Sequence, residues 1–398
     1  MEKSLDRKLR SIHADPHGST EFIIADAKDA DMAFGMGAPG KSPERHDGEV
    51  RFKTLADYRQ QIREVVGQGI VDIVLMSAST SERLTIEERI FEGSTVTPAA
   101  RANDATDVHV VRGGTIHTEA ARPFRSAALD HIQCGHLDCQ PAERTVGANL
   151  GLYSVTFNNR SELDLDTLGR FKEFREEAER KGFRYFLEIF DPNLPDAVPA
   201  EHTPGFVNDL VARSLAGVTD AGRPLFLKMV YHGPQAMEEL VRYDPHLVVG
   251  VLGGAAGTTL DAFQLLHETR KYGGRAALFG RKINQAECQL AFIEFLRHIA
   301  YGLIEPVEAV RAYHAVLEKL DIQPNRSLEE DLTFKTPVMS YGGSGKTISL
   351  PTHRSGQSPS ARETKNRTSD AARPDFASMT SDERLEYHQQ RLNGMFGS

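Results

Sequence analysis

Residues 225–279 contain three short apolar runs, LFLKMV at 225–230, LVVGVL at 247–252 and AALF at 276–279. Residues 236–242 and 259–272, which lie between these runs, are predicted to form helices. Nearly continuous apolar runs are typical of parallel strands that helices cover on both faces, whereas strands with one wet face alternate. The stretch therefore predicts successive strand–helix–strand units of one parallel sheet.

The same pattern continues towards the N-terminus. Helices are predicted at residues 55–66, 165–181 and 204–215. The further strand candidates are FIIA at 22–25, IVDIVLM at 70–76, the weaker VHVV at 108–111, LGLYSVTF at 150–157 and YFLEIF at 185–190. Eight strands that alternate with helices over about 280 residues match the size of a (β/α)8 TIM barrel. We predict this barrel over residues 1–322, with a doubly wound open sheet as the alternative, because one sequence does not show closure.

The C-terminal part differs in character. Two helices are predicted after the last strand, at residues 286–303 and 307–320, with Pro306 early in the second, where its missing N–H costs least. Residues 351–375 contain no Val, Ile, Leu or aromatic residue and are expected to be poorly ordered. We assign residues 323–398 to a largely disordered C-terminal extension. The capping-box pair Thr380 and Glu383 predicts a short helix near residues 382–392.

Composition excludes several classes of protein. The 398 residues include 47 Lys+Arg and 56 Asp+Glu, a net charge of −9, which offers no general attraction for nucleic acid. No apolar run approaches the roughly 20 residues of a membrane helix, and the N-terminus lacks the apolar centre of a signal peptide. Three cysteines make a disulfide framework unexpected. We expect a cytoplasmic protein without a nucleic-acid or membrane partner.

A lysine and a glutamate lie inside two neighbouring predicted strands. In such barrels the reacting groups sit at the C-terminal ends of strands. Lys228 is flanked by Leu227 and Met229, and burial disfavours the ammonium form and frees the amine to attack a carbonyl. Glu188 lies within the preceding strand, and a carboxylate beside such an amine can move protons through imine formation. A buried structural salt bridge is the alternative interpretation.

Charged residues crowd the end of the first predicted strand. Asp26, Lys28, Asp29 and Asp31 lie within six residues and precede a glycine-rich turn. A single acidic residue after a strand is more often a helix N-cap than a catalyst, but this density indicates that at least one group faces the site. Lys28 and Tyr231 are the side chains that we expect to bind substrate there.

Glycines follow the seventh and eighth predicted strands. Gly253 and Gly254 end one strand, and Gly280 and Arg281 end the next. Glycines let backbone N–H groups approach an anion, and these two loops form the recurrent phosphate site of TIM barrels. We therefore expect a phosphate here. Tight turns alone are the alternative explanation for each glycine.

Three other features are not assigned to the site. YGGSGKT at 341–347 resembles a phosphate-binding loop, but Ser340 occupies the place of its first glycine and no strand precedes it. Cys134, His136 and Cys139 match no standard zinc spacing, so we expect no metal. Residues 77–107 are predicted to form a long insertion after the second strand, either a lid or a subunit contact.

The strand-end motifs resemble the class I (Schiff-base) aldolases with barrel folds, and most closely tagatose-1,6-bisphosphate aldolase together with the archaeal-type fructose-bisphosphate and autoinducer-processing aldolases. YFLEIF is similar to the strand with the catalytic glutamate and FLKMVYHG to the strand with the Schiff-base lysine, which implies these roles for Glu188 and Lys228. GVLGGA and ALFGRKINQ resemble the phosphate-binding strand ends. IIADAK resembles the first strand, whose aspartate assists proton transfer, which maps most simply onto Asp26.

The chain departs from these families in three places. Phe190 stands where the fructose-bisphosphate branch has a tyrosine proton donor, the Asp-His-Gly of the first strand is absent, and LGLYSVTFNN lacks the lysine of the tagatose branch. Because the first-strand motif is missing, Asp29 and Asp31 compete with Asp26 for its role. These departures concern the substrate more than the type of reaction.

The resemblance implies a class I aldolase that cleaves or forms a C–C bond in a phosphorylated ketose without a cofactor or metal. Lys228 would form the iminium, Glu188 would move protons, and Asp26 or Asp29 would accept the hydroxyl proton. The alternatives are a metal-dependent aldolase or sugar-phosphate isomerase, and a barrel that binds sugar phosphate without turnover. We expect a homo-oligomer with a small-molecule sugar phosphate as its partner.

Overall fold

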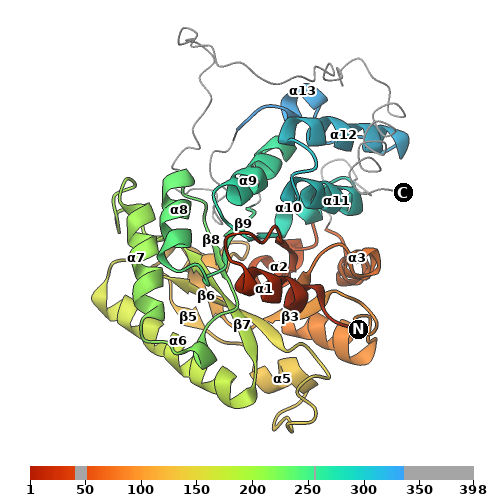
Figure 1. The fold of residues 1–398 in the computed structure, drawn as a ribbon. Coiled ribbons are helices and arrows are strands. Elements are labelled where there is room, and N and C mark those ends of the chain that lie inside the picture. The colour runs from red at the N-terminus through yellow and green to blue at the C-terminus, as the bar shows by residue number, and fades with distance from the viewer. Residues whose placement is uncertain (41–51, 255–256, 336–398) are drawn as a thin grey trace.

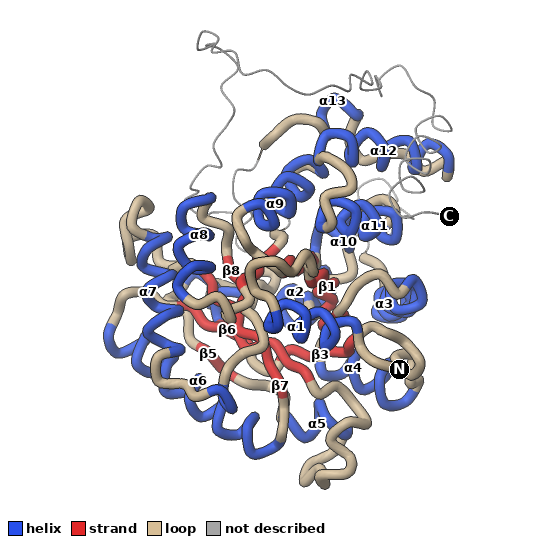
Figure 2. The backbone as a smooth tube through the Cα atoms, in the orientation of Figure 1, coloured by secondary structure: helices blue, strands red, loops and turns tan. Residues whose placement is uncertain are grey.

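The computed structural model describes residues 1–40, 52–254 and 257–335. Its core is a closed barrel of parallel strands in the order β1-β10-β9-β8-β7-β6-β3-β2 (Figures 1 and 2). The strands are β1 (Ile23–Lys28), β2 (Ile73–Met76), β3 (Thr97–Arg101), β6 (Leu150–Thr156), β7 (Arg184–Phe190), β8 (Leu227–Met229), β9 (Val249–Leu252) and β10 (Ala276–Phe279). Closure between β1 and β10 confirms the predicted TIM barrel and excludes the open sheet.

The third strand lies elsewhere than predicted. It is β3, at Thr97–Arg101, whereas Val108 belongs to a 3-10 turn. Apart from Arg101, β3 is built from small residues, TPAA, and its Ala100 pairs with Gly151 of β6. A search for large apolar residues therefore passes over it. The predicted insertion at residues 77–107 is consequently wrong as a single loop, since it contains α4 (Ala78–Ser81), a π-helical turn (Glu82–Glu87), β3 and the start of a hairpin formed by β4 (Asp104–Ala105) and β5 (Pro123–Phe124).

Helices surround the barrel, as Figure 2 shows. The longer ones lie where the sequence predicts them: α3 (Leu55–Gln68), α6 (Ser161–Lys181), α7 (Thr203–Leu215), α8 (Pro234–Tyr243), α9 (Thr259–Lys271), α11 (Gln289–Ala300) and α12 (Pro306–Lys319). Shorter helices are α2 (Ala30–Phe34), α5 (Leu129–Cys134), α10 (Arg281–Gln285) and α13 (Leu328–Asp331). Capping boxes at Thr54 and Thr258 satisfy backbone N–H groups where α3 and α9 begin.

A helix that the sequence analysis missed, α1 (Ser4–Ala14), closes one end of the barrel. Leu5 and Leu9 pack with inward-facing strand residues such as Phe186. Lys8 donates to the carbonyl of Phe22 at 2.7 Å and pairs with Asp72 at 2.7 Å. Phe22 and Asp72 directly precede β1 and β2, so α1 covers the N-terminal end. The opposite end, where the strands finish, is the mouth of the barrel.

Alternation along each strand sorts the side chains into two sets. Phe186 of β7 and Ala25 of β1 point into the barrel, whereas Leu187 and Ile24 belong to the core between strands and helices. Side chains alternate across a strand, so every second residue of a strand points into the barrel. Near the end of the strand, only these residues can reach the mouth.

The last described residues pack on the barrel helices. Asp331 of α13 accepts from the backbone N–H of Thr259 at 2.8 Å and contacts His314 Nε2 at 3.0 Å. The helix predicted near residues 382–392 and the YGGSGKT segment lie outside the described residues. In the part of the chain that the structure describes, no helix combines the length and the apolar character needed to span a bilayer.

Candidate active site

Lys228 and Glu188 meet inside the barrel. They lie opposite each other in the register of β7 with β8. Both point inward because Phe186 and Phe226, two residues earlier on each strand, stack inside the barrel with ring centroids 4.5 Å apart. Lys228 Nζ lies 2.5 Å from Glu188 Oε1, and the two side chains are 5% and 0% exposed. The structure thus brings together the two residues that the sequence pattern singled out.

Arg101, which the sequence analysis missed, connects the charged groups of the mouth. Its guanidinium donates to Asp29 Oδ2 at 2.7 Å and to Ser154 Oγ at 3.2 Å, and it lies 3.9 Å from Glu188 Oε2. Ser154 Oγ in turn donates to Glu188 Oε2 at 2.7 Å. Arg101 is fully buried, and a planar guanidinium suits such a buried carboxylate network. The one signal in the sequence was a lone arginine within the small-residue run TPAAR.

Of the aspartates after the first strand, Asp29 faces the mouth. Asp29 lines the same pocket as Lys228. It continues the alternation of Ala25 and Ala27, which point into the barrel. Asp31 instead accepts a hydrogen bond from Ser77 at 2.6 Å, and burial raises the pKa of its carboxyl group.

Asp26 and Lys28 do not reach the mouth, contrary to expectation. Both are fully buried on the outward side of β1, where Lys28 Nζ lies 3.0 Å from Asp26 Oδ2. Lys28 also contacts Asn284 of α10 and, at 3.3 Å, Gln289 of α11. Burial raises the pKa of Asp26 and lowers that of Lys28, and each group partly offsets this effect on the other. The two form an ion pair between the barrel and its helices.

The residues that we expected to bind phosphate lie around one small pocket, together with Lys228 and Asp29. Its lining includes Gly253, Gly254, Gly280 and Arg281. The pocket encloses about 30 Å³, room for water more than for a sugar.

Close packing by itself also requires two of these glycines. A Cβ on Gly253 would lie 2.1 Å from the ring of Phe279, and one on Gly280 would lie 2.6 Å from the carbonyl oxygen of Ala27. The Arg281 guanidinium stacks 5.0 Å from the ring centroid of Phe34, so α2 holds it against the mouth.

Tyr231 lies on the wrong face of β8 to bind substrate at the mouth. It belongs to the core between strands and helices, because it alternates with the inward-facing Lys228 and Val230. Burial raises the pKa of its hydroxyl group. The side chain of Tyr231 therefore points away from the mouth, and its role in substrate binding stays a prediction.

Asp107, an acidic residue that was not predicted as part of the site, lies beside the mouth. Thr156, which faces inward from β6, donates to Asp107 Oδ2 at 2.7 Å. Burial raises the pKa of Asp107 to about 6, and the charge of Glu188 acts in the same direction. Asp107 is placed by the loop between β4 and β5, so its sequence position carries no signal of this proximity.

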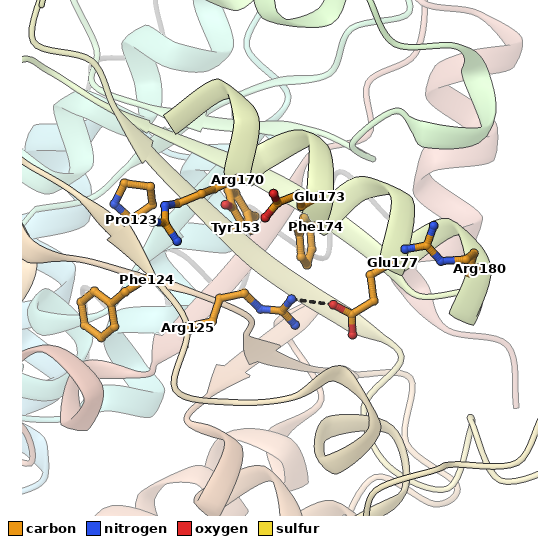
Figure 3. Close-up of a pocket in the computed structure, with 9 residues that line it drawn as sticks. All are labelled: Pro123, Phe124, Arg125, Tyr153, Arg170, Glu173, Phe174, Glu177 and Arg180. Carbon is orange, nitrogen blue, oxygen red and sulfur yellow. Dashed lines mark hydrogen bonds and ion pairs between the residues drawn. The ribbon is translucent and has the colours of Figure 1, made fainter. Parts of the chain in front are cut away.

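A larger cavity lies outside the barrel. It encloses about 530 Å³ between the hairpin strand β5, β6 and α6. An ion pair of 2.6 Å between Arg125 and Glu177 crosses it, and Arg170 and Arg180 stand at its sides (Figure 3). None of the mouth residues line this cavity.

No protein-family model and no curated protein matches the chain. Among solved structures, an archaeal fructose 1,6-bisphosphate aldolase matches with a TM-score of 0.53 at 14% identity, over 74% of this chain and 99% of that chain. A fructose-bisphosphate aldolase from Slackia heliotrinireducens DSM 20476 matches with a TM-score of 0.54 at 12% identity, over 78% and 91%. The Schiff-base-forming fructose-1,6-bisphosphate aldolase of a mechanistic study matches with a TM-score of 0.53 at 15% identity, over 75% and 100%. The chain therefore has a TIM-barrel fold that is similar to the fold of these aldolases. At these identities the similarity concerns the fold.

Proposed function

We propose that this protein is a class I aldolase that cleaves or forms a C–C bond in a phosphorylated ketose through a Schiff base on Lys228. The observation that carries the proposal is the 2.5 Å contact between Lys228 Nζ and Glu188 Oε1 at the mouth. One solved structure of similar fold is described as an archaeal aldolase whose catalytic Lys is covalently bound to the carbinolamine intermediate. The alternation that turns Lys228 inward gives this chain a lysine suited to the same chemistry.

The Lys228–Glu188 pair supports the proton transfers of imine formation. Glu188 takes a proton from the Lys228 ammonium, and the neutral amine attacks the ketone carbon while one of its remaining protons passes from nitrogen to the carbonyl oxygen. Glu188 then returns a proton to the carbinolamine hydroxyl, which leaves as water and creates the iminium. Ser154 holds the other oxygen of Glu188 at 2.7 Å, so Oε1 stays directed at the lysine.

Asp29 is the group that we assign to C–C cleavage. It removes the proton from the substrate hydroxyl, the C–C bonding electrons move to the iminium nitrogen, and an aldehyde leaves an enamine on Lys228. Arg101, 2.7 Å from Asp29 Oδ2, keeps this carboxylate in place. Protonation of the enamine and hydrolysis of the iminium release the ketone and free Lys228.

The chemistry of the glycine-rich side of the mouth supports a phosphorylated substrate. Arg281 and the backbone around Gly253 and Gly280 lie beside Lys228, and such loops bind phosphate through N–H groups and a charged side chain. Homo-oligomer formation and a cytoplasmic location remain predictions.

Borohydride trapping tests the proposal. The protein is reduced in the presence of fructose 1,6-bisphosphate or dihydroxyacetone phosphate, and we expect a mass increase that maps to the peptide with Lys228. Lys228→Met should abolish both turnover and trapping. Lys172→Met, at an exposed lysine on α6 that pairs with Glu176 at 3.3 Å, is the matched control and should change neither.

Two results would contradict the Schiff base. An adduct on another lysine would move the site, and activity that a chelator stops without any adduct would favour a metal-dependent aldolase or isomerase. Tight binding of the sugar phosphate without turnover or adduct would favour a non-catalytic barrel.

A further inference from the structure

A second group of chemically reactive side chains lies at the N-terminal end of the barrel. Cys134 ends α5, and the loop at residues 135–149 leads directly into β6. Because this loop enters a strand at its start, it lies at the end opposite the mouth. In Figure 1 the yellow loop after α5 extends from the lower edge of the molecule.

Two thiols and a carboxylate converge in this loop. The Sγ atoms of Cys134 and Cys139 and a carboxylate oxygen of Glu143 all lie within 4.8 Å of one another. Both cysteines are buried, at 8% and 7% exposure. Thiolates and a carboxylate that converge in this way are a set of donor atoms that a divalent metal ion can bind.

A fourth ligand stands at the edge of the cluster. His136 Nε2 lies 3.5 Å from Glu143 Oε1. The Nδ1 atom of the same ring lies 2.8 Å from the carbonyl oxygen of Leu137, which can only accept, so Nδ1 carries the hydrogen and Nε2 offers its lone pair. A histidine that donates its other N–H to a backbone carbonyl is the usual arrangement of a metal ligand.

We propose that residues 134–143 bind one structural zinc ion. Cys134, Cys139 and Glu143 supply three ligands, and His136 Nε2 supplies the fourth. Two sulfur atoms with one nitrogen and one oxygen suit tetrahedral zinc, and four protein ligands make a closed, structural site. Zinc bonds of 2.0–2.3 Å put neighbouring ligand atoms about 3.3–3.8 Å apart. The two sulfur atoms and the Glu143 oxygen, within 4.8 Å of one another, are near this spacing, and the His136 ring has to turn towards them.

The backbone of the loop is arranged to bring the two cysteines together. Gly135 and Asp138 have positive φ angles of 86° and 60°, and these reverse the chain between Cys134 and Cys139. Asp130 accepts from the backbone N–H of Asp138 at 3.2 Å and pairs with Lys181 at 2.5 Å, which anchors the loop to the end of α6.

In the sequence, this segment has no standard zinc spacing and no second Cys/His pair, so a metal was not expected there. The structure shows that all four donor groups come from one short loop, so a second pair is not needed. Since the cluster lies at the end of the barrel opposite Lys228, the zinc proposal stands apart from the proposed aldolase reaction.

Metal content of the full chain tests the proposal. After purification with zinc and removal of the excess, we expect about one zinc ion per chain by elemental analysis. Cys134→Ser and Cys139→Ser should lose it, whereas Cys288→Ser, at a half-buried cysteine outside the cluster, should keep it. Cobalt in place of zinc should give thiolate-to-metal absorption that Cys139→Ser lacks.

A milder variant covers the case in which the cysteine variants fail to fold. Glu143 is 41% exposed, so Glu143→Gln does not disturb the core. It should weaken zinc binding at least about ten-fold in competition with a chromophoric chelator, since even partners of metal ligands contribute this much. Glu176→Gln on α6 is the matched control and should bind zinc like the wild type.

Equal zinc content in the wild type and Cys139→Ser would overturn the proposal. So would a wild-type chain that keeps no zinc while both thiols react with an alkylating agent. A Cys134–Cys139 disulfide found by peptide mapping of zinc-loaded protein would overturn it as well, in favour of a redox pair.

Discussion

Asp107→Asn should change how the stability of the barrel depends on pH. Asp107 lies beside the mouth, where Thr156 donates to it at 2.7 Å. Asparagine keeps an oxygen that can accept this hydrogen bond but does not titrate. The substitution therefore removes the buried charge and leaves the local contact in place.

The expected magnitude follows from the pKa of the carboxyl group. Burial raises the pKa of Asp107 from 3.8 to about 6 in the folded protein. The folded state therefore binds the proton more tightly than the unfolded state. The stabilisation from this proton is complete below pH 3.8 and is lost as the pH rises through about 6, which amounts to about 3 kcal/mol.

Urea unfolding of the two proteins between about pH 4 and pH 8 measures the effect. The free energy of unfolding of Asp107→Asn, minus that of the wild type, should rise by about 2.5 kcal/mol over this pH range and level off above pH 6.5. Asp166→Asn, at an exposed carboxylate on α6 paired with Arg170, should give a difference within about 0.5 kcal/mol at all pH values. A difference for Asp107→Asn that does not vary with pH would refute the reasoning.

Three further predictions concern the mouth and the closed end of the barrel. Arg101→Met leaves the buried carboxylates of Asp29 and Asp104 without the guanidinium that pairs with them, while Glu188 keeps Lys228. It should cost about 3–5 kcal/mol of stability by urea unfolding, whereas Arg101→Lys should cost less. Arg281→Ala should raise KM for a sugar phosphate about 10- to 100-fold and leave kcat nearly unchanged, and inorganic phosphate should compete with substrate; an unchanged KM would remove Arg281 from the phosphate site. Leu9→Ala in α1 should lower the stability by about 2–5 kcal/mol in thermal or urea unfolding, because Leu9 fills the closed end of the barrel; a neutral result would show that α1 is dispensable.

The fold could be predicted where strands carry large apolar residues. The runs that became β7 and β8 are recognisable from their composition, and with them the neighbouring positions of Glu188 and Lys228. β3 could not be recognised, because Thr97, Pro98, Ala99 and Ala100 give it no large apolar residue. Because β3 was not predicted, Arg101 was not recognised either, although it forms the centre of the charged network.

The first strand shows why motif similarity alone misplaced a site residue. The segment IIADAK suggested Asp26, but the inward set of β1 is Ile23, Ala25 and Ala27. Continuing this alternation by one step leads to Asp29, whereas Asp26 and Lys28 fall on the other face and neutralise each other there. The sequence could have shown which residues of β1 face the mouth only if the inward-pointing apolar residues were known. In a strand that is buried on both faces, the apolar pattern does not distinguish the inward from the outward residues.

The alternation of side chains also makes the mouth apolar above the Lys228–Glu188 pair. Phe190 and Val230 each lie two residues after the charged pair, so they face inward and form, with Leu252, an apolar layer above it. This layer reduces contact of the Lys228–Glu188 pair with water, which strengthens their interaction and favours proton exchange between them over exchange with solvent. In the proposed aldolase reaction Phe190 has no proton to give to an enamine carbon on Lys228, so we expect a carboxyl group of the mouth to supply it. In the proposed reaction Glu188, which contacts the lysine, is a carboxylate again once the carbinolamine has lost water. Asp29 then holds the proton that it removed from the substrate hydroxyl, so Asp29 is the carboxyl group that can protonate the enamine.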